Sequence, residues 1–173
     1  MKLTALNSTD AKLLASIATH ESGHLIVASA YGLRPKAFIG GPRSAIVKHD
    51  HCTLFELAAI SWAGVLAEDL TANRYPDRTL PACELARGNL TGWIAAMIAG
   101  GLTELKAYSS PDVAGIASHP CTFETARAAF QILTANLDLL REFAGELADE
   151  SWLRFRLNEN DFANAERLCA LAQ

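Results

Sequence analysis

Apolar residues recur at helical spacing in the first part of the chain. They are Leu13, Leu14, Ile17, Leu25 and Ala28. Ser8, Thr9 and Asp10 precede this run and can accept hydrogen bonds from the first backbone amides of a helix. Gly32 follows it as a natural C-terminal stop. The pattern therefore predicts one helix over residues 11–31, roughly 30 Å long.

The next stretch has the pattern of short strands. Pro35 ends the first helix, and strand-like runs over residues 36–39 and 44–48 flank a Gly-Gly-Pro turn at residues 40–42. We therefore expect a small β element directly after the first helix.

Two further helices and a loop are predicted before residue 110. Thr53 can cap a helix over residues 54–72, whose small apolar residues suit close packing against the first helix. Prolines and charges over residues 73–86 indicate a loop. A helix over residues 90–107 should break or bend at Gly100-Gly101.

The clearest helical pattern begins at Thr122. Apolar residues follow in alternating steps of three and four, which predicts one long helix with a core-facing seam, ending near Asp149. The seam consists of Phe123, Ala126, Phe130, Leu133, Leu137, Leu140, Ala144 and Leu147. A final helix is expected over residues 161–171. The predicted fold is mainly α with a small β element, in a single domain over residues 1–173 whose C-terminal helical part spans residues 122–173.

Composition narrows the class of protein. Half of the 173 residues are hydrophobic and a fifth are charged, which is typical of a globular domain. A net charge of −4 without a basic stripe argues against binding to nucleic acid or to anionic membranes. No apolar run approaches the ~20 residues that span a bilayer. The N-terminal residues are too few and too polar for a signal peptide, so we expect no membrane insertion.

The cysteines indicate the compartment. The chain has four, and none forms a Cys-x-x-Cys pair. This distribution argues against a cysteine zinc site and favours a reducing compartment. We therefore expect a cytoplasmic protein.

The first predicted helix carries a candidate metal site. His20 and His24 are four residues apart, so on a helix both imidazoles face the same side and can reach one cation, typically zinc (Zn2+). Glu21 is rotated by about 100° from His20, so its carboxylate can flank the metal and take a proton from a bound water. The alternative is a core histidine pair in which each ring is bonded to a carbonyl.

A catalytic zinc ion needs a third protein ligand, and two carboxylates are candidates. Glu68 lies on the predicted second helix, 44 residues after His24, where a polar side chain on an apolar stripe is either exposed or part of the zinc site. Asp112 lies 88 residues after His24. Its alternative role is that of an N-cap for a helix over residues 113–118.

His49 and His51 form a second histidine pair. On a strand, residues two apart share a face, so the pair could bind a second metal. A solvated loop leading into the next helix is the simpler interpretation. In a third interpretation, one of the two faces the cleft and stabilises an oxyanion.

Three segments, taken together, resemble FtsH-type zinc metallopeptidases. His-Glu-Ser-Gly-His-Leu-Ile-Val-Ala at residues 20–28 is similar to the metal-binding helix of that family. Residues 63–70, Ala-Gly-Val-Leu-Ala-Glu-Asp-Leu, resemble its Gly-Gly-Arg-x-Ala-Glu-Glu segment. Residues 109–113, Ser-Ser-Pro-Asp-Val, resemble the Ala-Ser-Asn-Asp-Ile segment that supplies the third zinc ligand.

The resemblance implies a zincin-like, FtsH-peptidase-like helical domain. It implies Asp112 as the third ligand, Glu68 as a residue that orients a histidine, and an insertion over residues 73–108. The sequence contains no Walker-type phosphate-binding motif. We therefore expect that the chain cannot unfold proteins by itself. Its expected substrates are peptides, unstructured chains, or chains delivered by a separate ATPase or adaptor partner.

The leading functional hypothesis is a zinc metallopeptidase in which Glu21 is the general base and His20, His24 and Asp112 bind the metal. The alternative is a catalytically inactive, peptidase-derived binding or regulatory module whose metal is structural or absent. A metal-dependent hydrolase acting on another kind of bond is a third possibility.

Overall fold

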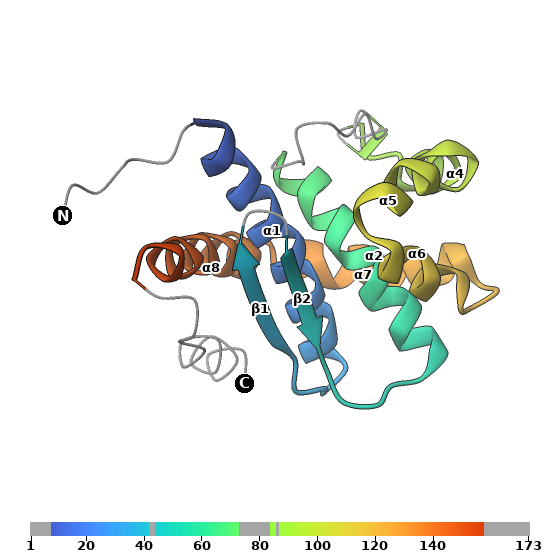
Figure 1. Cartoon of the computed structure of the whole chain (residues 1–173). Helices are drawn as coiled ribbons and strands as arrows, with labels where there is room; N and C mark the ends of the chain where they lie inside the picture. Colours follow the sequence, from blue (N-terminus) through green and yellow to red (C-terminus); the bar gives the residue numbers. More distant parts are fainter. Residues whose placement is uncertain (1–7, 42–43, 73–83, 86, 158–173) are drawn as a thin grey trace.

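The computed structural model describes residues 8–41, 44–72, 84–85 and 87–157 (Figure 1). The predicted final helix over residues 161–171 lies outside these residues. The described part is mainly helical with one small antiparallel sheet, as predicted. None of its helices is long and apolar enough to cross a membrane.

The first helix, α1, spans Ser8–Ala30 and therefore begins three residues before the predicted start. It ends where Gly32 adopts a positive φ of 73°, and the Gly32 amide donates to the Ser29 carbonyl at 2.8 Å. A residue without Cβ reaches this conformation at no steric cost, which is why glycine stops the helix here.

The strands β1 (Lys36–Gly41) and β2 (Ser44–Lys48) form the predicted hairpin. Lys36 pairs with Lys48 and Ile39 with Ala45, and the register shifts between Ile39 and Gly41. Figure 1 shows the hairpin lying against α1. Ala37 and Ile39 are buried in a small apolar cluster with residues of α1 and α8, so the hairpin is held against the helix that carries the two histidines.

The central element is α2, Leu54–Thr71. Thr53 caps it as predicted: its hydroxyl accepts from the Glu56 amide, and the Glu56 carboxylate accepts from the Thr53 amide in return. The helix is buried continuously over residues 58–69 and contacts α1, α6 and α7. A helix that is covered on all sides in this way forms the middle of the fold.

The chain then returns to α2 through a series of short helices. They are α4 (Leu90–Ala96), a π-helical segment (Met97–Gly101), α5 (Leu102–Tyr108) and α6 (Ser110–Ala117). The predicted interruption at Gly100-Gly101 is thus a π-helical segment rather than a sharp break. Trp93 of α4 packs beside Trp62 of α2, with ring centroids 5.6 Å apart, and anchors this series to the main core.

The prediction of one long helix from Thr122 to Asp149 is wrong. The structure has two helices, α7 (Thr122–Ala135) and α8 (Leu137–Leu157). At Asn136 the side-chain amide donates to the Ile132 carbonyl at 2.8 Å, so a polar side chain competes with the helical backbone. The apolar steps of three and four continue across the break and conceal it in the sequence.

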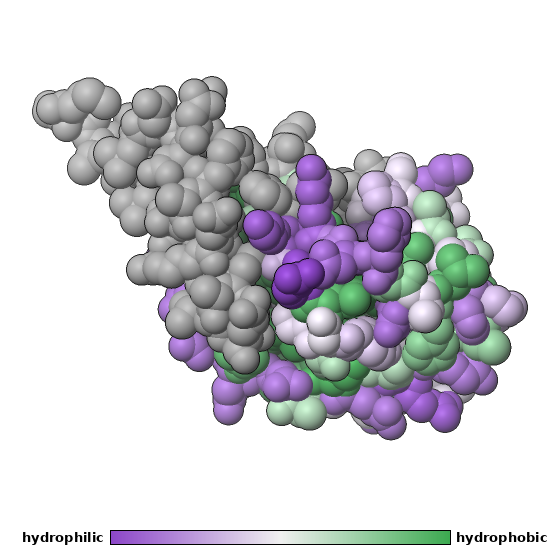
Figure 2. Space-filling model, turned by 90° about the horizontal axis from the view of Figure 1, so that it is seen from below, coloured by the Kyte–Doolittle hydropathy of each residue, from purple (hydrophilic) through white to green (hydrophobic). Residues whose placement is uncertain are grey.

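The core-facing role of the seam is confirmed. Ala126, Leu133, Leu140, Ala144 and Leu147 are buried. Phe123, Phe130 and Leu137 are half-buried against the main core. Figure 2 views the molecule from below and shows hydrophilic side chains interspersed with hydrophobic ones on that face.

Candidate metal centre

His20 and His24 lie one turn apart on α1 and are both buried. Their ring centroids are 4.7 Å apart and the ring planes meet nearly edge-on, at 79°. The helix therefore brings the two imidazoles together, as the spacing predicted.

The Nδ1 atoms of both rings have hydrogen-bond partners. His24 Nδ1 lies 2.7 Å from the Ile60 carbonyl oxygen, and His20 Nδ1 lies 2.6 Å from Glu68 Oε1. A carbonyl oxygen and an ionised carboxylate can only accept, so each Nδ1 donates its proton. The two Nε2 atoms are then the nitrogens with lone pairs available for a cation.

Asp112 faces both Nε2 atoms. Its Oδ2 lies 3.0 Å from His20 Nε2, and its Oδ1 lies 3.5 Å from His24 Nε2. The candidate ligand atoms of His20, His24 and Asp112 all lie within 4.8 Å of one another, and these residues form the one such group found among the described residues. A carboxylate 88 residues away in sequence thus joins the histidine pair.

The interpretation of Asp112 as an N-cap is wrong. α6 begins at Ser110, so Asp112 lies inside its first turn, and Pro111 fits there because a first-turn amide needs no helical partner. The Asp112 carboxylate instead accepts a hydrogen bond from the Ser109 hydroxyl and faces the histidines.

Glu68 is buried on α2 and contacts His20 from the side opposite to Asp112. Its Oε1 accepts from His20 Nδ1, and its Oε2 lies 3.4 Å from the Ser16 hydroxyl. Because Glu68 engages Nδ1 while Asp112 faces Nε2, the two carboxylates flank opposite edges of the same ring. This is the arrangement expected of a residue that orients a metal-binding histidine.

Two glycines make the site geometrically possible. A Cβ built on Gly64 would lie 2.4 Å from His20 Nε2, so the ring occupies space that only glycine leaves open. A Cβ on Gly23 would lie 2.4 Å from the Ala63 carbonyl oxygen, so α1 and α2 approach closely at this point. The Gly-x-x-x-Glu spacing of α2 therefore accommodates the ring of His20 with one residue and binds it with the other.

Glu21 is buried, and its Oε2 has no hydrogen-bond partner among the described residues. Burial raises the pKa of its carboxyl, while the neighbouring His24 and His20 act in the opposite direction. An orphaned buried oxygen is costly unless a group absent from the protein chain satisfies it. A metal-bound water would be such a group.

His24 and Asp112 shift each other's titration. Burial is the largest single effect on His24 and lowers its pKa, but the charge of Asp112, its hydrogen bond to His24 and the charge of Glu21 together raise the pKa. For Asp112, burial works to raise the pKa, but the charge of His24 and hydrogen bonds to both histidines hold it well below its usual range. Without a metal, these groups form an ion pair.

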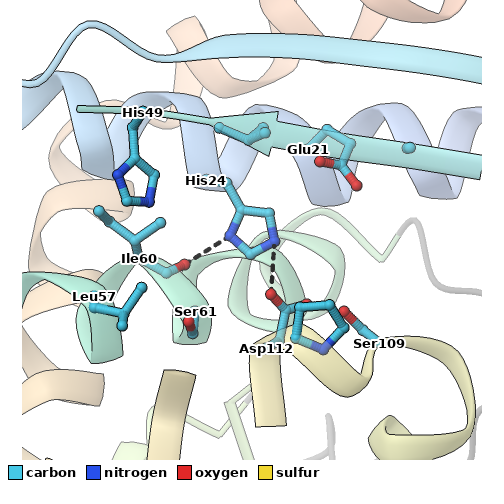
Figure 3. Close-up of a pocket in the computed structure, with 11 residues that line it drawn as sticks. Glu21, His24, His49, Leu57, Ile60, Ser61, Ser109 and Asp112 are labelled. Atoms are coloured by element: carbon cyan, nitrogen blue, oxygen red, sulfur yellow. Dashed lines mark hydrogen bonds and ion pairs between the residues drawn. The ribbon is translucent and has the colours of Figure 1, made fainter. Parts of the chain in front are cut away.

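The site opens into a pocket with a volume of about 210 Å³ (Figure 3). Glu21 and His24 of α1, Ser109 just before α6, and Asp112 of α6 supply most of its polar lining. The apolar lining comes from β2, α2 and α6 through Ala45, Val47, Leu57, Ile60 and Pro111. A reacting group entering this pocket would meet Glu21, one histidine and Asp112 together.

The structure separates the second histidine pair. His49 lines the pocket, whereas His51 is exposed and is not part of its lining. Neither belongs to a group of metal-ligating side chains within the described part of the chain. A second metal site at this pair has no support in the structure.

Sequence reasoning missed three contributors: Ser109, Ser16 and the Ile60 carbonyl. Ser109 is the first residue of the 109–113 segment that carries Asp112, so its position was a usable signal. Ser16 lies one turn before His20 and was also visible in principle. The Ile60 carbonyl carries no residue-specific signal, because every residue has one.

Comparisons with protein-family models, curated proteins and solved structures give no significant match. The resemblance to FtsH-type peptidases, the zincin-like fold and the insertion over residues 73–108 therefore stay predictions.

Proposed function

We propose that this protein is a zinc-dependent peptidase. The observation that carries the proposal is the convergence of His20, His24 and Asp112 beside the buried, unpartnered carboxylate oxygen of Glu21. Two imidazole nitrogens and one carboxylate form a donor set that zinc prefers, and a three-ligand set leaves one position for water.

The surroundings of the donors also suit a metal. The Ile60 carbonyl and Glu68 hold the two Nδ1 protons, so each Nε2 presents a lone pair to the same point. His20, His24 and Asp112 would hold the ion. When bound, zinc supplies a Lewis acid that lowers the pKa of a coordinated water to about 7.

The chain's own residues supply the proton transfer. Glu21 would take the proton from the attacking water as it reaches the scissile carbonyl, then deliver that proton to the leaving amine. Burial keeps bulk water from competing for the Glu21 carboxylate. The apolar wall of Val47, Leu57 and Pro111 would hold the substrate against it.

The pocket favours an extended chain as substrate. Its volume of about 210 Å³ is smaller than the 300–1,000 Å³ typical of sites for whole small molecules. It suits one side chain of a peptide together with the adjoining backbone. Folded proteins would need prior unfolding, for which a separate ATPase or adaptor is the proposed partner.

The test uses Glu21→Gln and one matched control. Zinc-loaded wild type should cleave casein, an unstructured protein, and a chelator should abolish cleavage. Glu21→Gln should lower turnover by about 100-fold to 10,000-fold while retaining one zinc per chain. Glu142→Gln, an exposed change on α8, should behave like wild type. Full activity in Glu21→Gln would exclude the proposed mechanism.

The inactive binding module is the second hypothesis. Structural zinc sites use four protein ligands, whereas the described residues bring three together, which favours the catalytic interpretation. Zinc binding without chelator-sensitive cleavage of casein or of a peptide library would instead support the module. Cleavage of another bond type would point to a different metal-dependent hydrolase.

A further inference from the structure

His49 belongs to the same pocket as the candidate metal centre but comes from a different element. It follows directly after β2, whereas Glu21 and His24 come from α1 and Asp112 from α6. Figure 3 shows its ring projecting from the end of β2 toward α2, on the side of the strand where His24 lies. His49 can therefore meet a substrate from a wall other than the metal-binding one.

The ring of His49 is held in a defined orientation. Its Nδ1 lies 2.8 Å from the Asp50 carbonyl oxygen, which can only accept, so Nδ1 carries a proton. The Asp50 side chain accepts from Arg34 Nε at 3.0 Å, which ties this turn to the loop after α1. Nε2 is left to interact with a pocket occupant, and it donates when the ring is an imidazolium.

Attack on a peptide carbonyl places negative charge on the carbonyl oxygen, and a hydrogen-bond donor at that oxygen lowers the barrier. Few donors line the pocket. The Ser109 hydroxyl donates to Asp112, and His24 Nδ1 donates to the Ile60 carbonyl. The Ser61 hydroxyl also lines the pocket but is neutral, so His49 is the lining side chain that can bring both an uncommitted N–H and a positive charge.

We propose that His49 is a catalytic residue that donates a hydrogen bond through Nε2 to the substrate carbonyl oxygen as negative charge develops there. This inference rests on the proposed peptidase function. His49 forms and breaks no covalent bond.

The experiment compares His49→Ala with His51→Ala, which removes an exposed histidine two residues away. With zinc-loaded proteins and a fluorogenic peptide cleaved by wild type, His49→Ala should lower kcat by about 100-fold with KM nearly unchanged. His51→Ala should match wild type. His49→Gln retains an N–H donor, so its kcat should be about tenfold higher than that of His49→Ala. Zinc content and melting temperature should be equal in all four proteins.

A second measurement separates stabilisation of the oxyanion from substrate binding. A peptide phosphonate carries a tetrahedral anionic group, so His49→Ala should weaken its binding by about the same factor as kcat. When His49→Ala is added to the inactive Glu21→Gln variant, the affinity for the uncleaved peptide should stay unchanged.

The outcomes are distinguishable. If wild type cleaves the peptide while His49→Ala matches His51→Ala, the role of His49 is overturned and the peptidase proposal stands. If His49→Gln is as slow as His49→Ala and phosphonate affinity is unchanged, the donor role is overturned. If zinc-loaded wild type cleaves no peptide, both proposals are overturned.

Discussion

At His20, each ring nitrogen has its own partner. Glu68 accepts from Nδ1 at 2.6 Å, and Nε2 faces Asp112 at 3.0 Å. The ring also fits against Gly64, where any side chain would collide with it. At the residue scale, the proposed metal affinity therefore depends on residues of α2 that would not touch the ion.

The first prediction concerns Glu68. Glu68→Gln keeps the side-chain volume and one acceptor oxygen but removes the negative charge that fixes the tautomer of His20. Zinc affinity should fall by about 10-fold to 100-fold. Competition with a chelator of known affinity measures the zinc affinity of each variant. Glu142→Gln on the exposed face of α8 is the control. An unchanged zinc affinity would argue that Glu68 does not act through His20.

At the scale of elements, the fold depends on how closely α1 approaches α2. A Cβ on Gly23 would lie 2.4 Å from the Ala63 carbonyl oxygen and 2.8 Å from Ala67 Cβ. Backbone atoms of a buried helix cannot yield, so the contact requires glycine at the cost of helix propensity. Any increase in the distance between α1 and α2 at Gly23 would also separate the histidines from Glu68 and Ile60.

The second prediction compares two helical glycines. Gly23→Ala should destabilise the protein by about 1–3 kcal/mol through overpacking, despite the better helix propensity of alanine. Gly145→Ala on α8 meets nothing within 4 Å and should stabilise it by about 0.5–1 kcal/mol. Urea unfolding of both variants measures the difference. Equal effects at the two sites would contradict the close approach of α1 and α2.

At the scale of the whole molecule, the metal-free protein buries charged groups at its centre. The pKa of Asp112 is lowered and that of His24 is raised by their pairing. Asp112 stabilises the fold above its unfolded pKa of about 3.9, and this contribution is lost as pH falls through its folded pKa. His24 stabilises the fold below about pH 6.5, and this contribution is lost as pH rises through its folded pKa.

The third prediction follows from these signs. With a chelator present, the free energy of unfolding should be highest between about pH 4 and 6.5 and should decline as pH rises further. The raised pKa of Glu21 also lowers stability as pH rises, because ionising a buried carboxyl disfavours the folded state, and this smaller loss begins above its unfolded pKa of about 4.3. Zinc should reverse the decline, since it binds neutral imidazoles and its affinity increases with pH.

Unfolding midpoints from pH 4 to 9, with chelator and with zinc, provide the measurement. Asp112→Asn should flatten the decline in chelator, because it removes the partner of His24. A decline of equal size in this variant would place its origin elsewhere in the molecule.

Much of the fold could be predicted from periodicity and capping. The helix 54–72 with its Thr53 cap, the hairpin and the first helix are local patterns that tertiary contacts did not override. The break at Asn136 could not be predicted, because the apolar steps continue through it and the competing hydrogen bond arises in the folded chain. The exposed His51 and the pocket-lining His49 were indistinguishable, because both lie at the point where strand periodicity ends.

By itself, the sequence determined that His20, Glu21 and His24 share one helical turn, because helix geometry depends only on residues close in the chain. Only the tertiary structure decided that Asp112 faces the two Nε2 atoms while Glu68 contacts Nδ1 of His20. That assignment depends on where α2 packs against α1 and where α6 packs against α2. The packing is set by contacts between distant residues, such as those at Gly23 and Gly64, which no local pattern specifies.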